Sequence, residues 1–498
     1  MLTKIIVLSI YIGILFLIGI MASRRIKNMS DFYVGGKNMG FWAVAFSARA
    51  TGESGWLLIG LTGMGALAGL SAYWVVLGEL AGVAISWFFM AKLFKRRSDA
   101  FKSITIPDYL ESHFKSTTHT LRILSASVLS IFVIIYVSSQ IDATGIAFES
   151  MLGLNYFTGA LIGFFIVLIY IFIGGFVAAV WSDLFQGALM FLGLVLLPIV
   201  VWFSMDHGQG IIEGLNAIDP ALTDIWGGSD DWWMNLFTIL GFSMIGLGFL
   251  GSPQVYVRFM SIKNEAEIDK GKWVAIVFTL LTDAAAVSIG VLARVLFTEN
   301  GQDPEAVFGI GATDVLNMMT ENFLPYVLVA IYVAIVLSAI MSTIDSLLII
   351  ASSAITRDFY QKIFRPDLKD HELTNISRIV TVVMAVIALG IAMAIALLSP
   401  ERQVFWVIIF GWSGIAATFC PVIILSLFWK GYSEKGAIAS MVSGFLSVML
   451  IKFVVQDMES VGAYFVKLDV LAPSFLVAMI FGFIFSKFFP PQHPAVDI

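Results

Sequence analysis

The stretch from Phe46 to Gly63, FSARATGESGWLLIGLTG, decides the fold predicted for this chain. It lies in an apolar segment of membrane-spanning length, yet it carries an arginine, a glutamate and four glycines within eighteen residues. Gly52 and Gly55 each weaken a helix by about 1 kcal/mol relative to alanine, and serine and threonine oxygens surround them. Irregular backbone is tolerated in a bilayer only where protein buries it or where it lines a cavity. We therefore expect a broken transmembrane helix wrapped around a substrate and a cation.

The same stretch also has a purely structural interpretation. Small residues let two membrane helices pack closely, which accounts for the glycines. It leaves Arg49 and Glu53 unexplained, because charged side chains inside a membrane are costly and usually functional. The two residues are four positions apart, so they can pair along one helical face.

The composition is typical of a polytopic membrane protein. Of the 498 residues, 59% are hydrophobic and only 13% are charged, unlike the average soluble domain. The single cysteine, Cys420, excludes an intramolecular disulfide and a thiolate metal cluster. At about 20 apolar residues per crossing, the sequence predicts thirteen spans, at 3–22, 40–69, 71–94, 120–149, 157–176, 184–204, 234–252, 274–297, 323–353, 376–398, 404–428, 435–454 and 468–488.

The charges of the loops predict the orientation. With the N-terminus outside and the C-terminus in the cytoplasm, the inner loops hold 23 of the 29 lysine and arginine residues, Arg258 among them. The outer stretch 205–233 has six acidic residues and no basic one. Positive residues concentrate on the cytoplasmic side of membrane proteins. The asymmetry therefore supports thirteen spans in the cell membrane.

The second half of the chain repeats the first in a coarse way. Two groups of five spans, 40–204 and 234–428, each begin with a glycine-rich span and run through the membrane in opposite senses. Residues 1–39 add one span and a linker, 205–233 an outer loop, and 429–498 two spans and a short cytoplasmic tail. Inverted five-helix repeats with interrupted first helices are typical of secondary transporters, whose site lies near the midplane. The alternative is a chance alignment of hydropathy.

The sharpest cation signal lies in the span 323–353. Ala339, Ser342, Thr343 and Ser346 follow the spacing i, i+3, i+4, i+7 and share one helical face, with Asp345 beside them. Two hydroxyls and a carbonyl from this face, joined by carbonyls freed where the first helix breaks, form an all-oxygen shell for a small cation. The alternative is that the hydroxyls only bond to carbonyls one turn earlier.

Several motifs resemble one family. The segments SGWLL at 54–58, IGGF at 173–176, WSDLFQ at 181–186, SPQVYVRFM at 252–260, SAIMSTIDSLL at 338–348 and GAIASMVSG at 436–444 are similar to the sodium/solute symporter family, and closest to its sodium/proline symporter branch. The resemblance runs from the first span to the last. It implies an all-α membrane fold of the leucine-transporter type, with ten core helices in inverted fives, one helix before them and two after.

The resemblance also implies the site residues. It places a sodium ion between the carbonyls of Ala50 and Glu53 and the face formed by Ala339, Ser342 and Thr343. Some relatives hold a second sodium ion, and the corresponding positions here are Asp183, Ser342, Asp345 and Ser346, with a carboxylate in place of one serine. The positions that match the family's substrate pocket are Ser54, Gly55, Tyr136, Ile245, Pro253 and Gln254.

Two departures from the proline branch concern the substrate. Proline symporters carry an aspartate where this chain has Gly52, and a tryptophan where it has Ile245. The second change would enlarge or reshape the pocket. A small amino acid or an organic acid remains favoured, because the ends of broken helices suit a carboxylate.

Together these patterns predict sodium-coupled import of a small organic solute by alternating access. Proline or another small amino acid is favoured, and another organic acid, a vitamin or a sugar is the alternative. The expected partners are the solute, Na⁺ and the lipid bilayer, with a monomer as the functional unit; neither enzymatic activity nor nucleic-acid binding is expected. An ion channel or a transport-like sensor is a remote alternative, because no repeated filter loop and no appended signalling domain is visible in the sequence.

Overall fold

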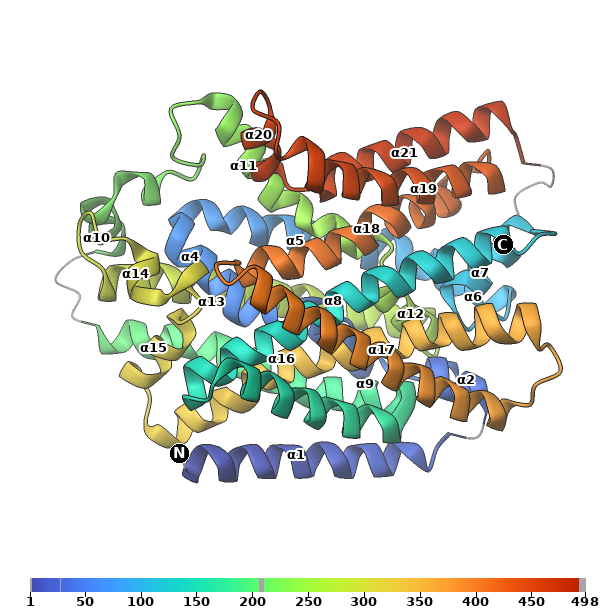
Figure 1. The fold of residues 1–498 in the computed structure, drawn as a ribbon, viewed down its shortest axis with the longest axis horizontal. Coiled ribbons are helices and arrows are strands. Elements are labelled where there is room, and N and C mark those ends of the chain that lie inside the picture. Colours follow the sequence, from blue (N-terminus) through green and yellow to red (C-terminus); the bar gives the residue numbers. More distant parts are fainter. Residues whose placement is uncertain (1, 27, 206–209, 492–498) are drawn as a thin grey trace.

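Long helices run side by side along the longest axis of the molecule (Figure 1). The computed structural model describes residues 2–26, 28–205 and 210–491. Lys27, residues 206–209 of the predicted outer loop and the predicted tail from 492 onward lie outside these ranges.

The first half of the chain contains α1 (Leu2–Ser23), α2 (Met29–Val34), α3 (Phe41–Gly55), the helical turn η2 (Trp56–Leu61), α4 (Thr62–Ala68), α5 (Tyr73–Ile85), α6 (Ala91–Ala100), α7 (Ile106–Phe114), α8 (Thr120–Leu152), α9 (Tyr156–Ser204) and α10 (Ile211–Ile218). The second half contains α11 (Trp232–Met244), the turn η6 (Ile245–Leu250), α12 (Pro253–Ser261), α13 (Glu265–Phe297), α14 (Pro304–Phe308), α15 (Val315–Phe323), α16 (Tyr326–Ser353), the helical segment η8 (Ala354–Phe364), α17 (Asp370–Leu398), α18 (Val404–Phe428), α19 (Glu434–Leu450), α20 (Gly462–Leu468) and α21 (Leu471–Phe488).

The described residues include eleven helical stretches that are long and apolar enough to cross a membrane. One of them, Phe41–Ala100, has 60 residues and covers both predicted spans 40–69 and 71–94. The chain turns between them at Gly69, where φ is 58°. Helix α9 covers the predicted spans 157–176 and 184–204, and it is kinked at Gly175 inside the IGGF motif. An all-helical membrane fold is confirmed, while the count of thirteen spans stays a prediction.

Both predicted helix interruptions are confirmed. Ser54 near the end of α3 has φ 32° and ψ −166°, outside the helical range, and the turn η2 follows. In the second half, α11 gives way to η6, and Gly251 then has φ 157° before α12 begins at Pro253. Proline is favoured in a first helical turn because it needs no N–H donor there. Each break exposes backbone groups inside the protein.

Helix α16 lies at the centre of the molecule. Each of its residues from 332 to 353 is buried, and it packs against α1, α3, α8 and α9. The second broken segment is held against α5 by a close backbone approach, since a Cβ atom on Gly246 would lie 1.9 Å from the carbonyl oxygen of Gly78. Thus the two breaks face a rigid, tightly packed interior.

Candidate functional site

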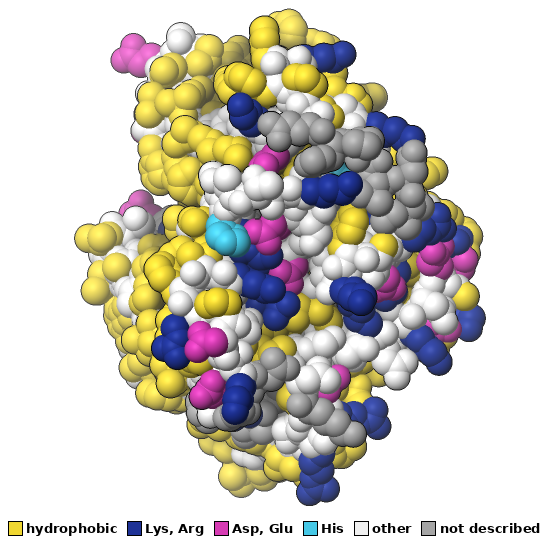
Figure 2. Space-filling model, turned by 90° about the vertical axis from the view of Figure 1, so that its right-hand side faces the viewer, with side chains coloured by type: hydrophobic (Ala, Val, Ile, Leu, Met, Phe, Trp, Pro, Cys, Tyr) yellow, Lys and Arg dark blue, Asp and Glu magenta, His cyan; other side chains and the backbone are white. Residues whose placement is uncertain are grey.

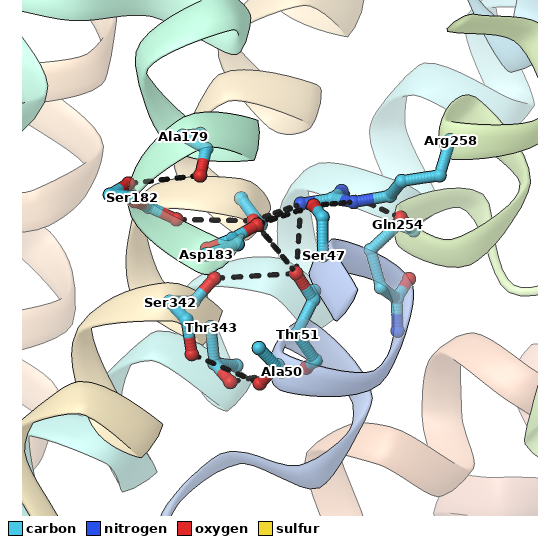
Figure 3. A network of polar contacts seen from close by, with 12 residues as sticks. Ser47, Ala50, Thr51, Ala179, Ser182, Asp183, Gln254, Arg258, Ser342 and Thr343 are labelled. Carbon is cyan, nitrogen blue, oxygen red and sulfur yellow. Dashed lines mark hydrogen bonds and ion pairs between the residues drawn. The ribbon is translucent and has the colours of Figure 1, made fainter. Parts of the chain in front are cut away.

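The predicted first cation group comes together between α3 and α16 (Figure 3). The hydroxyl of Ser342 donates to the carbonyl oxygen of Ala50 at 3.0 Å, and that of Thr343 to the carbonyl oxygen of Thr51 at 3.1 Å. The same hydroxyl oxygens lie 3.1 and 3.2 Å from the carbonyl oxygen of Ala339. Bonds within α16 and bonds to the broken helix are therefore both present.

The carbonyl oxygens of Ala50, Thr51 and Ala339 and the hydroxyl oxygens of Ser342 and Thr343 form a group of five oxygens. This group has more acceptor sites than donors. Each hydroxyl has a single hydrogen, yet each lies within hydrogen-bond distance of two carbonyl oxygens. The side chains of Ser342 and Thr343 are fully buried. A buried group of oxygens with few hydrogens is the environment that a hard cation prefers.

The carbonyl of Glu53, which the resemblance implies as a sodium ligand, stays a prediction. This oxygen accepts a hydrogen bond from the N–H of Trp56. The side chain of Glu53 contacts Arg49, with 2.5 Å between Oε1 and Nη2. The predicted pairing of Arg49 with Glu53 is thus confirmed, and Thr51 also contributes a carbonyl to the oxygen group.

Two residues of the implied second sodium site, Asp183 and Ser346, contact Arg258, and Figure 3 shows Asp183 close to the end of this side chain. Asp183 Oδ2 accepts hydrogen bonds from Ser47 Oγ at 2.5 Å and from Arg258 Nη2 at 3.2 Å. The same guanidinium donates to Thr51 Oγ1 at 2.8 Å and to Ser346 Oγ, and Ser346 in turn donates to Asp345.

The count of loop charges placed Arg258 in an inner loop, and this prediction was wrong. The side chain is fully buried on α12. The helix that follows the second break carries this side chain back into the interior, where it neutralises Asp183. Only its place in the SPQVYVRFM motif, two turns after the break, distinguished it from a loop arginine in the sequence.

The implied substrate residues of the first half gather at the break in α3. Tyr136 Oη donates to Ser54 Oγ at 3.4 Å, and the backbone N–H of Gly55 donates to Gln140 Oε1 at 3.0 Å. Gln140 also donates to Ser54 at 3.4 Å. The position of Gln140 beside the break depends on how α8 packs against α3, which no local pattern in the sequence indicates.

The second break contributes Ile245, Pro253 and Gln254. The Ile245 carbonyl accepts the indole N–H of Trp412 at 3.1 Å. Pro253 begins α12. The side chain of Gln254 is 1% exposed, and neither polar atom of its amide has a hydrogen-bond partner among the described residues. In Figure 3 this amide extends beside α3. A buried amide without partners is costly.

Two aromatic rings that sequence reasoning missed fill the space between the breaks. Trp412 of α18 packs against Phe249 of η6 with 5.0 Å between ring centroids, and against Tyr136 at 6.5 Å. A Cβ atom on Gly52 would lie only 2.7 Å from the ring of Phe249. The aspartate that proline symporters carry at this position therefore does not fit unless Phe249 moves.

Ion-pair networks close both ends of α8. At one end, Arg402 pairs with Asp142, and Tyr156 Oη donates to the same carboxylate at 2.5 Å. At the other end, Arg122 contacts Asp358 of η8 and two carboxylates of α7, Asp108 and Glu111. With both networks formed, the candidate residues between them are buried.

The carboxylates of α7 lie outside the spans and are held ionised. Burial alone would raise the pKa of Asp108, but Arg357 and Arg122 outweigh it and lower that pKa. Burial acts in the same direction on Glu111, and the hydrogen bond and charge of Arg122 lower the pKa of this carboxyl as well. Both carboxylates of α7 are thus charged at neutral pH.

The model of the sodium:solute symporter family matches residues 32–444. The chain belongs to this family. Its relatives include the high-affinity proline transporter PutP of Bacillus subtilis (strain 168), 33% identical over 87% of this chain and 89% of the relative. The osmoregulated proline transporter OpuE of the same organism is 32% identical over 97% of this chain and 94% of its own length.

Solved structures agree on the fold. A Na⁺-coupled sialic acid symporter in a substrate-bound, outward-open state superposes with a TM-score of 0.77 at 18% identity, and the match covers 100% of this chain and 99% of the other. Mhp1, a nucleobase-cation-symport-1 family transporter, matches with a TM-score of 0.53 at 13% identity, over 93% and 96%. This member of the sodium:solute symporter family is a multi-span transporter of the plasma membrane, and not an enzyme.

Proposed function

We propose that this symporter imports proline together with sodium ions. The two curated relatives named above are both proline transporters, and they match nearly the full chain. The observation that carries the sodium part is the group of five buried oxygens contributed by Ala50, Thr51, Ala339, Ser342 and Thr343. The alternative solutes are another small amino acid, an organic acid, a vitamin or a sugar.

The sodium ion binds between α3 and α16 in this proposal. It replaces the hydrogens of Ser342 and Thr343 as the link between the broken helix and α16, so the carbonyls of Ala50 and Thr51 gain a full charge as their partner. Binding of sodium thereby orders the break beside Ser54 and Gly55, and raises the affinity for solute. Linkage requires that the solute raise the affinity for sodium by the same factor.

The solute lies between the two breaks. The hydroxyls of Ser54 and Tyr136 and the backbone at Gly55 are the polar groups on one side, and the unpartnered amide of Gln254 is the polar group on the other. The rings of Phe249 and Trp412 supply an apolar surface of the kind that a pyrrolidine ring packs against.

Transport proceeds by alternating access, with the two ion-pair networks of α8 opening in turn. The Asp142 and Arg402 network closes the outer side and the Arg122 network the inner side. Each sodium ion that enters down 100 mV supplies about 2.3 kcal/mol, which corresponds to about fiftyfold accumulation of solute before any sodium gradient is added.

The distribution of charge supports an orientation with the N-terminus outside. Figure 2 shows lysine and arginine side chains gathered on the end of the molecule that carries α6 and α7. Helix α1 begins at the opposite end and α21 finishes at the basic end (Figure 1). Positive side chains favour the cytoplasmic side. We place the basic end in the cytoplasm and take the monomer as the transporting unit.

A second sodium ion would bind at Asp183, Asp345 and Ser346 only if Arg258 withdrew from Asp183, since one guanidinium already contacts both Asp183 and Ser346. We therefore propose one sodium ion per proline, bound at the five-oxygen group. Two sodium ions per proline would show that Arg258 moves during the cycle.

The identity of the solute is tested by competition. Proteoliposomes with an inward sodium gradient take up labelled proline while unlabelled amino acids, pantothenate, sialic acid or sugars are added in excess. We expect proline itself to compete most strongly, and Gln254→Ala to weaken that competition. Sodium-driven uptake of another compound in the absence of any proline uptake would replace proline by that compound and leave the sodium site standing.

A further inference from the structure

A buried charge cluster lies beside the broken helix, on a different set of helices from the sodium group. Arg49 Nη2 is 2.5 Å from Glu53 Oε1, 3.5 Å from Glu79 Oε2 and 4.0 Å from Asp283 Oδ1. These side chains come from α3, α5 and α13, and each is at most 1% exposed. One guanidinium thus faces three carboxyl groups inside the membrane-spanning part of the protein.

The hydrogen-bond donors in the cluster do not satisfy three carboxylates. Arg49 directs Nε and Nη2 to Glu53, and Nη2 also reaches Glu79. Thr282 Oγ1 lies near Glu53 and Asp283, at 3.2 Å from each, but its one hydrogen also has the Phe278 carbonyl oxygen at 2.7 Å. Among the described residues, no hydrogen-bond partner lies near Arg49 Nη1, Glu53 Oε2, Glu79 Oε1 or Asp283 Oδ2.

Two carboxyl groups accept hydrogen bonds from Arg49, and the negative charge of Glu79 is balanced less well than that of Glu53. Glu53 receives two guanidinium N–H groups, whereas Glu79 receives one at 3.5 Å. Three ionised carboxylates would leave the cluster with two uncompensated negative charges in a site without solvent, which is highly unfavourable. A carboxyl group in such a site instead takes up a proton and supplies the missing donor itself.

The groups that face Glu79 add no further positive charge. Helix α3 supplies Arg49 and Glu53, and α13 supplies Asp283. Segments η6 and α11, which also pack against α5, have no titratable side chain in their sequences IGLGFL and WWMNLFTILGFSM.

We propose that Glu79 is a proton-binding site, protonated in this conformation, and that loss of this proton impairs transport. The proton comes from water and binds the Glu79 carboxylate, leaving one guanidinium opposite two carboxylates. Ionised Glu79 would repel Glu53 and Asp283 across the helices that flank the break, so that α3, α5 and α13 could not close together. The part about transport depends on the function proposed above, whereas the protonation of Glu79 does not.

A metal ion fits this cluster less well than a proton. In the ranges that the structure describes, no three acidic, histidine or cysteine side chains are arranged to hold a metal ion. The guanidinium of Arg49 occupies the position between the acids, and it stacks on Phe249 at 4.6 Å. The alternative is a purely structural role for the cluster as a fixed set of ion pairs, which requires Glu79 to be ionised at neutral pH. Infrared spectroscopy distinguishes the ionised from the protonated carboxyl group.

The first test is infrared spectroscopy of the purified full-length protein at neutral pH. The difference between wild type and Glu79→Gln should contain the carbonyl stretching band of one protonated carboxyl group. Glu459→Gln, a change of the same type at an exposed loop position, should give no such band. A Glu79→Gln difference spectrum that shows only carboxylate bands would overturn the proposal, because Glu79 would then be ionised.

The second test is the pH profile of sodium-driven proline uptake. Above the pH at which the proton leaves, wild-type uptake should fall by up to about tenfold per pH unit, the factor of a one-proton equilibrium. Glu79→Gln should flatten this fall, while Glu79→Asp and Glu459→Gln should keep it. Equal slopes in wild type and Glu79→Gln would refute the link to transport. Absence of wild-type uptake at every pH would refute the proposed function instead, and the infrared result would still decide protonation.

A further variant, Asp283→Asn, guards against misfolding of Glu79→Gln. Asp283→Asn removes one of the repelling charges, so the carboxyl band of Glu79 should disappear at lower pH than in wild type. An unchanged titration of that band would contradict the proposal.

Discussion

Thr343→Ala tests the proposed sodium site at one side chain. The change removes the Cγ2 methyl group and Oγ1, and Oγ1 lies 3.1 Å from the Thr51 carbonyl oxygen and 3.2 Å from that of Ala339. Interactions of a hydroxyl with a charged partner contribute about 1.5–3 kcal/mol, which corresponds to about 10- to 150-fold in affinity. The sodium concentration that gives half-maximal proline uptake should therefore rise by this factor, at saturating proline.

Two variants serve as controls for Thr343→Ala. Thr343→Ser keeps the hydroxyl and should stay close to wild type. Thr279→Ala removes an equally buried hydroxyl that bonds to the carbonyl one turn earlier in α13, Ala275, so it reports the general cost of this change in a membrane helix. The reasoning would be refuted if Thr343→Ala shifted the sodium dependence no more than Thr279→Ala does.

Four further outcomes are expected. Arg122→Gln removes the counter-charge that the carboxylates of α7 and η8 share, at a cost of about 3–5 kcal/mol. Thiol labelling of the buried Cys420, the one cysteine in the chain, should therefore accelerate. An unchanged labelling rate would show that this network does not close the inner side. Arg402→Ala removes the partner of Asp142 and the ring contact with Tyr156, and should weaken proline binding from outside; equal half-saturation in this variant and wild type would contradict the outer closure. Gln254→Ala should raise half-saturating proline by about tenfold, the factor of one buried hydrogen bond, while the sodium dependence stays as it is. In the folded protein, Asp108 and Glu111 have pKa values below their ordinary values of 3.8 and 4.5. Their contribution to stability is therefore complete above the ordinary values and is lost as the pH falls through the folded-state pKa values. The melting temperature of Asp108→Asn should thus lie below that of wild type at neutral pH and approach it in strong acid.

Much of the fold was predictable because each element has a local signal. The glycines and serines around Ser54 predicted the first break, and the run from Ile245 to Pro253 predicted the second. The helical spacing of Ser342 and Thr343 predicted the face that meets the broken helix. The spacing of Arg49 and Glu53 predicted their ion pair, which a single turn of helix determines.

Other features depend on packing between distant helices, which carries no local signal. The sequence suggested a loop position for Arg258, since a charged residue after an apolar span usually lies in one; tertiary packing instead buries it against Asp183. Glu79 and Asp283 lie in separate spans far from Arg49 in the sequence, and only the fold brings them to it. The position of Trp412 between the two breaks follows from the path of α18.

Coupling between sodium and proline is measured most directly by accumulation at equilibrium. Proteoliposomes with internal and external proline are brought to a series of sodium gradients at a clamped voltage, and the final ratio of inner to outer proline is recorded. With one sodium ion per proline at zero voltage, that ratio should equal the ratio of outer to inner sodium. A proline ratio that stays at unity whatever the sodium gradient would contradict sodium-coupled symport.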